Sequence, residues 1–275
     1  MKADSFFIFI KTDFMKKPKE IIALEKVYNI KLQQTFVKDD IVTGENTNLF
    51  FTDKKNEVVG LNLSDNNIES IRGFENFNEL LYLNLYKNSL KVVNGLQALF
   101  NLEILIISNN KIVKLNEIPT PKLKMLNLSH NCITKIKGFE KLKNLEELYL
   151  TGNQIKEMNA IDNLKSLKTL KIDFNALTEV DFQVLSNCNI IHLDLRNNWI
   201  NKYRNLEVMK EIKHLNLTYN KINEVEIIKE ILNLKKLNFI NVEGNPFLDK
   251  TDLELCGCGY ENHLDDLRKY FSSQC

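Results

Sequence analysis

Proline and glycine are scarce in this 275-residue chain, which has 4 prolines and 9 glycines. Collagen-like and linker-rich architectures need far more of both, so they are excluded. Long apolar runs are missing too. The longest run near the N-terminus, residues 6–10, is too short for a signal peptide or for a membrane span of about 20 residues. We therefore do not expect a membrane protein.

Cysteine content and net charge are also low. The 5 cysteines are an odd number without the spacing of a secreted disulfide framework, which favours a reduced, cytoplasmic protein. The formal net charge is +1, whereas nucleic-acid-binding proteins usually present a basic face. Cys256 and Cys258 lie near His263, but their spacing is not that of a zinc finger. We expect no cofactor and no metal there.

Catalytic motifs are absent from the sequence. It has no phosphate-binding loop of the form G-x-x-x-x-G-K-[S/T]. Its serine, cysteine, histidine and aspartate residues form no catalytic set in a motif context. We expect a protein that is not an enzyme and has no small-molecule substrate.

Asparagine, in contrast, is abundant, with 37 residues, as many as lysine and arginine together. Many of these asparagines recur in an internal repeat of the form L-x-x-L-x-L-x-x-N-x-I. The copies begin at residues 58, 80, 102, 123, 145, 167, 190, 212 and 237, which lie 21 to 25 residues apart. A period of this length indicates a solenoid, in which repeats stack side by side.

Each copy carries the pattern of a short strand. Positions 4 and 6 are apolar and alternate with polar positions, as in Leu83-Asn84-Leu85. This alternation predicts a strand with one buried face. Stacked copies would form a parallel sheet whose positions 3, 5 and 7 face solvent on the concave side.

Position 9 is asparagine in every copy. Its amide can satisfy backbone groups that lose their partners where the chain turns away from the sheet. We therefore predict a structural asparagine ladder of Asn66, Asn88, Asn110, Asn131, Asn153, Asn175, Asn198, Asn220 and Asn245.

A second set of asparagines falls at position 5 of the copies, on the concave side. We expect these side chains to offer hydrogen bonds to a partner. They are Asn62, Asn84, Asn127, Asn216 and Asn241.

The second half of each repeat carries apolar residues three positions apart, for example Ile136, Phe139 and Leu142. This spacing predicts 3₁₀ turns or single helical turns on the convex side. Residues 223–236 form a longer insertion whose apolar spacing predicts a fuller helix.

Both ends of a solenoid need a cap, because the end repeats would otherwise expose the core. We assign residues 1–57 to an N-terminal cap, residues 58–250 to nine repeats and residues 251–275 to a C-terminal helical cap.

The caps have their own local patterns. Residues 18–32 predict an amphipathic helix that begins at a proline. Residues 48–52 and 57–63 flank a turn and predict a hairpin that leads into the first repeat. At the other end, residues 261–271 predict a helix that packs on the last repeat.

The repeat resembles the leucine-rich repeat of the short, 22-residue subclass over residues 58–250. This resemblance implies an α/β solenoid, a leucine-rich-repeat horseshoe with a parallel concave sheet and short 3₁₀ or helical convex segments, capped at both ends. Similar repeats occur in a phosphatase regulatory subunit, an axonemal dynein light chain and internalins. The C-terminal sequence Glu-Asn-His-Leu-Asp-Asp-Leu-Arg-Lys-Tyr is similar to the segment that closes the repeat array in bacterial Roco-type proteins.

The resemblance implies a non-catalytic module that binds another protein on its concave face. Three narrower functions stay open: a regulatory subunit of a protein phosphatase, a sensor or scaffold of a Roco-like GTPase assembly, and an internalin-like surface adhesin. Internalins carry a signal segment, which this sequence lacks. Neither nucleic acid nor a membrane is expected as a partner.

Six apolar or aromatic residues fall on the concave rows of four adjacent copies, where polar residues are the norm. Tyrosine beside aliphatic residues is typical of protein-binding hot spots. We therefore predict a partner-binding surface here, although the N-terminal region or a crystal neighbour would cover such residues equally well. We name these residues the tyrosine patch: Tyr82, Tyr86, Ile104, Ile106, Met125 and Tyr149.

A second concave cluster, the polar cluster, lies on the seventh and eighth copies and is expected to extend this surface. Its members are His192, Asp194, Arg196, Trp199, His214 and Tyr219. His192 and His214 occupy equivalent positions about 5 Å apart at the backbone. With Asp194 they have the ligand types of a zinc site, but the repeat phase alone produces such pairs, so we expect no metal. Trp199 either anchors a partner or packs on Tyr203.

Overall fold

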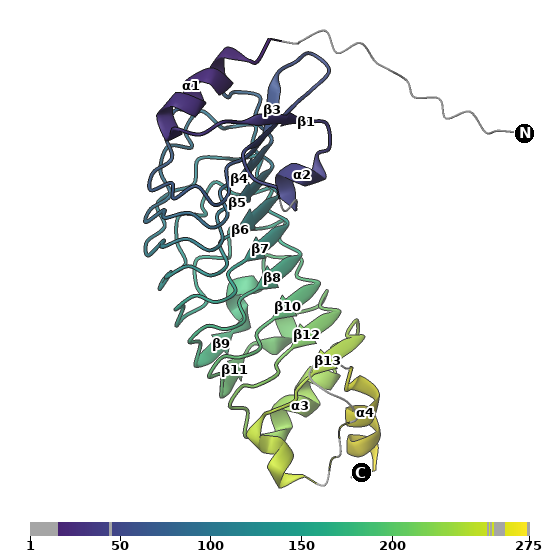
Figure 1. Cartoon of the computed structure of the whole chain (residues 1–275). Coiled ribbons are helices and arrows are strands. Elements are labelled where there is room, and N and C mark those ends of the chain that lie inside the picture. The colour runs from purple at the N-terminus through teal and green to yellow at the C-terminus, as the bar shows by residue number, and fades with distance from the viewer. Residues whose placement is uncertain (1–15, 44–45, 252, 254, 256–261, 274–275) are drawn as a thin grey trace, which may run out of the picture.

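The computed structural model describes residues 16–43, 46–251, 253, 255 and 262–273. Within these residues the chain forms one curved solenoid, with strands stacked along one side and irregular segments along the other (Figure 1). The expectation of a solenoid with a parallel concave sheet is confirmed.

Nine strands, one from each repeat, run parallel to one another in the sheet, and their order follows the chain. Neighbours pair in register, so position 3 of one repeat lies beside position 3 of the next, as Tyr82 lies beside Ile104. Equivalent positions therefore form straight rows across the sheet. The strands are β3 (Val58–Asn62), β4 (Tyr82–Asn84), β5 (Ile104–Ile106), β6 (Met125–Asn127), β7 (Glu147–Tyr149), β8 (Thr169–Lys171), β10 (His192–Asp194), β12 (His214–Asn216) and β13 (Phe239–Asn241).

The core lies between this sheet and the convex segments. The apolar side chains at positions 4 and 6 are buried in all nine repeats, as Leu148 and Leu150 are in the fifth. Each repeat covers the core residues of its neighbour, so one hydrophobic cluster runs the length of the solenoid.

Position 8, one residue before each ladder asparagine, has a left-handed backbone conformation with φ between +51° and +67°. Glycine and asparagine tolerate this conformation best, because other side chains crowd the following carbonyl. The sequence did not reveal it, because the residues at position 8 share no type. They are Asp65, Lys87, Asn109, His130, Gly152, Phe174, Asn197, Tyr219 and Gly244.

The ladder asparagines join consecutive repeats through their side chains. Asn153 is typical: its Nδ2 donates to the carbonyl oxygens of Leu128 (3.1 Å) and Leu150 (2.9 Å), and its Oδ1 accepts from the Ile133 N–H (3.0 Å). Asn66, at the first turn, is half-buried and instead donates to Asn48 Oδ1. The Asn153 pattern recurs at Asn88, Asn110, Asn131, Asn175, Asn198, Asn220 and Asn245.

The convex segments follow the apolar spacing of three. Phe77 donates its N–H to the Phe74 carbonyl and Leu80 donates to Phe77, which is the hydrogen-bond pattern of a 3₁₀ turn. The longer insertion forms helix α3 (Val225–Leu232), which is shorter than the stretch 223–236 suggested. The 3₁₀ helices are η1 (Phe182–Leu185), η2 (Leu206–Val208) and η3 (Pro246–Lys250).

A second parallel sheet, with two strands, is separate from the concave sheet. It pairs β9 (Glu179–Asp181) with β11 (Lys202–Arg204). The sequence did not predict it, because a spacing of three indicates turns and not strands.

Helix α1 (Lys19–Tyr28) is shorter than the helix expected over 18–32. Asn29 is left-handed, with φ of 53°, and ends the helix by donating its N–H to the Glu25 carbonyl. Leu32 is nevertheless buried. Its N–H donates to the Glu25 carboxylate, which also pairs with Lys17 at 2.8 Å and so fixes the chain beyond the helix.

The rest of the N-terminal cap contains β1 (Gln33–Thr35), helix α2 (Asp39–Val42) and β2 (Leu49–Thr52). β2 pairs antiparallel with β3 as the hairpin pattern predicted, and β1 pairs parallel with β2. Helix α2, which the sequence did not predict, contacts β3 and β4 and lies on the concave side (Figure 1).

At the other end, helix α4 (Leu264–Ser272) contacts β13 and α3. His263 donates its N–H to the Ile240 carbonyl, and Asn262 Oδ1 accepts from the Ile240 N–H, so these residues cover the edge of the last strand. Glu261, the expected start of this helix, lies outside the described residues. None of the helices in the described part of the chain has the length and apolar character needed to cross a membrane.

Candidate protein-binding surface

The concave sheet carries both clusters that the sequence singled out. The tyrosine patch lies on β4 to β7 and the turn after β4. The polar cluster lies on β10, β12 and the turns that follow them, and β8 separates the two clusters.

The N-terminal cap covers part of the tyrosine patch. The Asn84 amide donates to the Ile41 carbonyl of α2 at 3.1 Å. The ammonium group of Lys38 lies 4.4 Å from the centre of the Tyr82 ring. On the strands nearest the cap, the N-terminal region therefore covers the tyrosine patch, as one of the two alternatives proposed.

Exposure within the tyrosine patch is uneven. Tyr86 is exposed, whereas Tyr82, Ile104 and Met125 are half-buried. Ile106, expected to face solvent, is buried. The patch is smaller than the row positions alone suggested.

Tyr149, on β7, is held by its neighbours. Its hydroxyl donates to the Glu147 carboxylate, and Lys171 Nζ lies 5.6 Å from the centre of its ring. Burial and the Glu147 carboxylate raise the pKa of the Tyr149 hydroxyl. The side chain therefore stays a neutral donor near physiological pH.

The position-5 asparagines serve the fold itself. Each Oδ1 accepts the backbone N–H two residues further on, as Asn84 does from Tyr86 at 2.9 Å. Asn62, Asn84 and Asn241 are buried, so the expectation that they bond to a partner is wrong. Asn62 and Asn84 also donate Nδ2 to carbonyls of the N-terminal cap.

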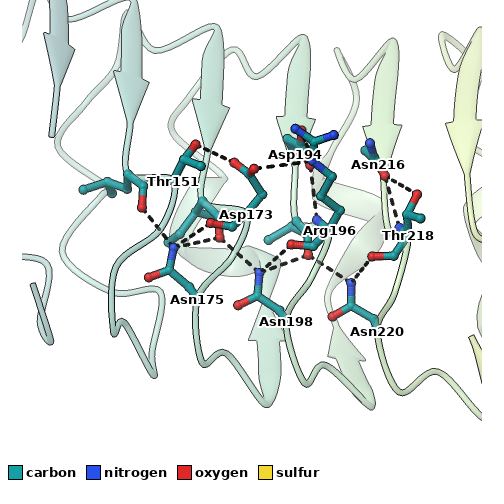
Figure 2. A network of polar contacts seen from close by, with 12 residues as sticks. Thr151, Asp173, Asn175, Asp194, Arg196, Asn198, Asn216, Thr218 and Asn220 are labelled. Carbon is teal, nitrogen blue, oxygen red and sulfur yellow. Dashed lines mark hydrogen bonds and ion pairs between the residues drawn. The ribbon is translucent and has the colours of Figure 1, made fainter. Parts of the chain in front are cut away.

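Two carboxylates of the concave face share one arginine (Figure 2). Arg196 Nε lies 3.4 Å from Oδ2 of Asp173 and 3.4 Å from Oδ2 of Asp194. Asp173 is buried and also accepts from Thr151 Oγ1 at 2.6 Å. Burial and the neighbouring charge of Asp173 raise the pKa of Asp194 to about 6, against the opposing effect of Arg196.

Asp194 occupies the position that is asparagine in five other repeats, and it makes the same bond, accepting the Arg196 N–H at 3.2 Å. Its folded pKa lies above the ordinary value of 3.8, so the ionised form destabilises the folded state above about pH 6. We expect Asp194→Asn to raise the free energy of unfolding by about 2 kcal/mol at neutral pH.

The gain from Asp194→Asn should shrink as pH falls through 6 and vanish below about 4, where the carboxyl is protonated in both states. Urea unfolding at several pH values measures it. A gain that does not change between neutral pH and pH 4 would contradict the assigned cause.

The rings of His192 and His214 contact each other on the concave face, with centres 4.5 Å apart and planes tilted by 35°. Phe239 stacks on His214, with ring centres 5.6 Å apart. Phe239 was not among the residues predicted from the sequence to bind a partner, although it lies in the same row as the two histidines. The three rings line a cavity of about 170 Å³ together with Lys171, Leu193, Asp194 and Asn216. We call this cavity the histidine pocket.

Three aromatic side chains are exposed on the turns that follow β8, β10 and β12, and we call them the aromatic edge. The exposed fraction is 52% for Phe174, 58% for Trp199 and 51% for Tyr219. The Arg196 guanidinium lies 5.8 Å from the Phe174 ring centre, and Lys221 Nζ lies 5.3 Å from the Trp199 ring. These strands are neighbours in the sheet, so the three rings lie along one edge of the concave face.

Phe174 and Tyr219 both have the left-handed backbone of position 8, with φ of 52° and 53°. This conformation costs a non-glycine residue about 1–2 kcal/mol, and an exposed ring recovers little of it by burial. A large aromatic side chain at such a position points to a surface role. Phe174 was missed because position 8 lies outside the predicted rows, although phenylalanine among mostly polar residues was a visible signal.

Trp199 does not pack on Tyr203. The Tyr203 ring stacks on Phe182 instead, with centres 5.7 Å apart. Of the two roles considered for Trp199, the contact with Tyr203 is therefore excluded.

The candidate metal ligands do not converge in the part of the chain that the structure describes. Histidine, cysteine, aspartate and glutamate form no group of three or more that is arranged to hold a metal ion there. Cys256 and Cys258 lie outside the described residues.

Known proteins share this architecture. The family model described as leucine-rich repeats in two copies matches residues 121–166 and 143–187. No curated sequence matches the chain.

Among solved structures, internalin InlF of Listeria monocytogenes is 20% identical over 81% of this chain, with a TM-score of 0.63. Internalin C2 of the same species is 21% identical over 82% of this chain and 93% of its own, with a TM-score of 0.59. The LRIM1/APL1C complex is 21% identical over 80% of this chain and 47% of that chain, with a TM-score of 0.58. This chain spans 64% of the InlF chain.

At these identities the likeness concerns the fold. The repeat of about 22 residues, the in-register parallel sheet and the matched family model agree with one another. The chain therefore has the leucine-rich-repeat fold, built from repeats of about 22 residues.

Proposed function

We propose that this chain binds another protein through its concave face, with the aromatic edge as the main anchor. Leucine-rich-repeat folds are typical protein-interaction modules, because the solenoid presents an extended concave surface. The observation that carries the proposal is the set of three aromatic side chains, each more than half exposed, on adjacent turns. Exposed aromatic residues next to cationic side chains are typical of binding hot spots.

The position of the N-terminal cap supports the C-terminal half of the face as the site. Helix α2 already lies over β3 and β4, where Lys38 and Ile41 contact the sheet. Helix α4 contacts β13 at the other end. The surface from β7 to β12 lies between these two covered ends.

The narrower functions differ in the partner that they require. A phosphatase catalytic subunit, a GTPase or a host-cell receptor would each select one of them. One solved structure with this fold is itself a complex of two proteins, LRIM1 and APL1C, which supports a protein partner in general terms.

We expect the double variant Trp199→Ser/Tyr219→Ser to lose the proteins captured by the native chain. Truncating aromatic anchors of this kind costs about 2–4 kcal/mol each, so affinity should fall by at least about thirtyfold. Affinity capture with mass spectrometry, followed by titration of the identified partner, measures the loss.

Phe100→Ser is the matched control, because Phe100 is 48% exposed but lies in the segment that leads into β5. The variant Tyr82→Ser/Tyr149→Ser tests the tyrosine patch separately. If the native chain, both double variants and the control retain the same partners with equal affinity, the concave face is not the binding site.

A further inference from the structure

The histidine pocket has a chemistry of its own within the concave face. Its two imidazole rings come from neighbouring strands in register, and Phe239 forms the apolar wall beyond them. Asn216 also lines it, with Oδ1 occupied by the Thr218 N–H and hydroxyl, so its Nδ2 is the group left for a ligand. The pocket thus combines imidazole and amide donors with an aromatic surface.

Charges of both signs surround these rings: Lys171, Lys213 and Arg196 are cationic, and Asp173 and Asp194 are acidic. Desolvation and the charges of His214, Lys171 and Lys213 lower the pKa of His192. The two carboxylates nearby, Asp173 and Asp194, are both engaged by Arg196. Neither Lys171 nor Lys213 has a carboxylate oxygen within ion-pair distance in the described part of the chain, although the charge of Lys171 still opposes the rise in the pKa of Asp194.

The other acidic groups of this half of the face are also occupied. Glu147 accepts the hydroxyl of Tyr149, one strand beyond Lys171. Glu243, on the turn after β13, interacts with the Tyr219 hydroxyl at 3.3 Å. Both glutamates keep their negative charge, because a tyrosine hydroxyl is a neutral donor, but neither of them lines the pocket.

We propose that the histidine pocket binds the carboxylate of an aspartate or glutamate side chain of the partner protein. This inference rests on the proposed function and names the chemistry of the partner. The carboxylate lies against His192 and His214, with Lys171 beside it and the Asn216 amide as a further donor. Asp194, which also lines the pocket, opposes this binding while it is ionised. The methylene groups of the acidic side chain pack on Phe239, and a cavity of about 170 Å³ has room for one such side chain.

Binding of a carboxylate here is coupled to protons. Protonation of His192, whose pKa is lowered from its ordinary value, adds positive charge beside the bound carboxylate. Protonation of Asp194, with its pKa of about 6, removes the negative charge that lies nearest the site. These changes act in the same direction, so affinity for an acidic group rises as pH falls through 6.

The test uses the full chain and two small probes, N-acetylglutamate N-methylamide and the isosteric glutamine compound. The Cε1–Hε1 NMR signals of the histidines report binding, and the chain has only 4 histidines. We expect the glutamate probe to shift the His192 and His214 signals, to bind on the order of tenfold more tightly at about pH 5.5 than at about pH 7.5, and to raise the apparent pKa of His192. The glutamine probe should leave both signals in place.

The single variants His192→Gln and His214→Gln, each followed through the pocket histidine that remains, should bind the glutamate probe more weakly, and His130→Gln, at an exposed turn after β6, should not. Equal shifts with both probes, or no shift with either, would overturn the pocket's assignment. If Trp199→Ser/Tyr219→Ser loses partner binding but the pocket binds the glutamate probe no better than the glutamine probe, only this inference is overturned. Unchanged partner binding in that variant would overturn the proposed function instead.

Discussion

Replacing Asn153 with alanine should lower the free energy of unfolding by about 3 kcal/mol and the melting temperature by about 6–12 °C. The side chain joins three backbone groups from two repeats: the Leu128 and Leu150 carbonyls and the Ile133 N–H. All three bonds are buried, and alanine leaves these groups without a partner. An unsatisfied buried group costs about 1–3 kcal/mol, so partial rearrangement still leaves a large loss.

Asn163→Ala is the matched control, because Asn163 is exposed and lies outside the ladder. Its melting temperature should stay within about 2 °C of the native value. Thermal unfolding by circular dichroism compares the two variants. Equal losses in both would show that the ladder bonds contribute nothing to stability.

The first asparagine of the ladder should contribute less to stability than Asn153. Asn66 is only half-buried and donates to Asn48 rather than to a preceding repeat. Asn66→Ala should therefore cost less than Asn153→Ala, since water can replace part of what is lost.

Features that recur with the repeat could be read from the sequence. A strand at positions 3 to 5 and asparagine at position 9 each appear in nine copies, so chance resemblance at one copy does not matter. Position 9 in particular has one residue type because its three bonds need an amide, with donor and acceptor together. At position 9, both the local hydrogen bonding and the stacking of the repeats therefore require asparagine.

Features that occur once could not be read in this way. Helix α2 covers part of the concave face through a bond between Asn84 and Ile41, which are 43 positions apart in the sequence. The sequence around either residue does not predict that they are in contact. The burial of Ile106 is likewise a tertiary property of one strand, and the row positions, which assume an open face, do not contain it.

The aromatic edge shows an intermediate case. Position 8 repeats in every copy, but its left-handed backbone tolerates several residue types, so no consensus marks it. Phenylalanine is unusual at this mostly polar position, and the backbone conformation adds that its large exposed ring carries a conformational cost. Sequence periodicity locates the position, and the backbone angle supplies the reason to examine it.

The second large effect concerns Gly138, on the convex side, where φ is +83°. A Cβ atom there would lie 2.2 Å from the Asn116 carbonyl oxygen and 2.7 Å from its carbonyl carbon, so backbone has to move. The Gly138 carbonyl accepts the Ile118 N–H at 3.0 Å, and the same movement would strain that bond. We expect Gly138→Ala to lower the free energy of unfolding by about 3 kcal/mol, of which about 1–2 kcal/mol is the left-handed backbone itself.

Gly152→Ala separates the two contributions. Its φ is also positive, at +67°, but the nearest atoms to a new Cβ belong to the His130 ring, an exposed side chain that can rotate away. This variant should lose only the conformational part, about 1 kcal/mol. Urea unfolding of both proteins measures the difference. If the two substitutions cost the same, contact with the Asn116 backbone is not what requires glycine at position 138, and the turn geometry alone determines it.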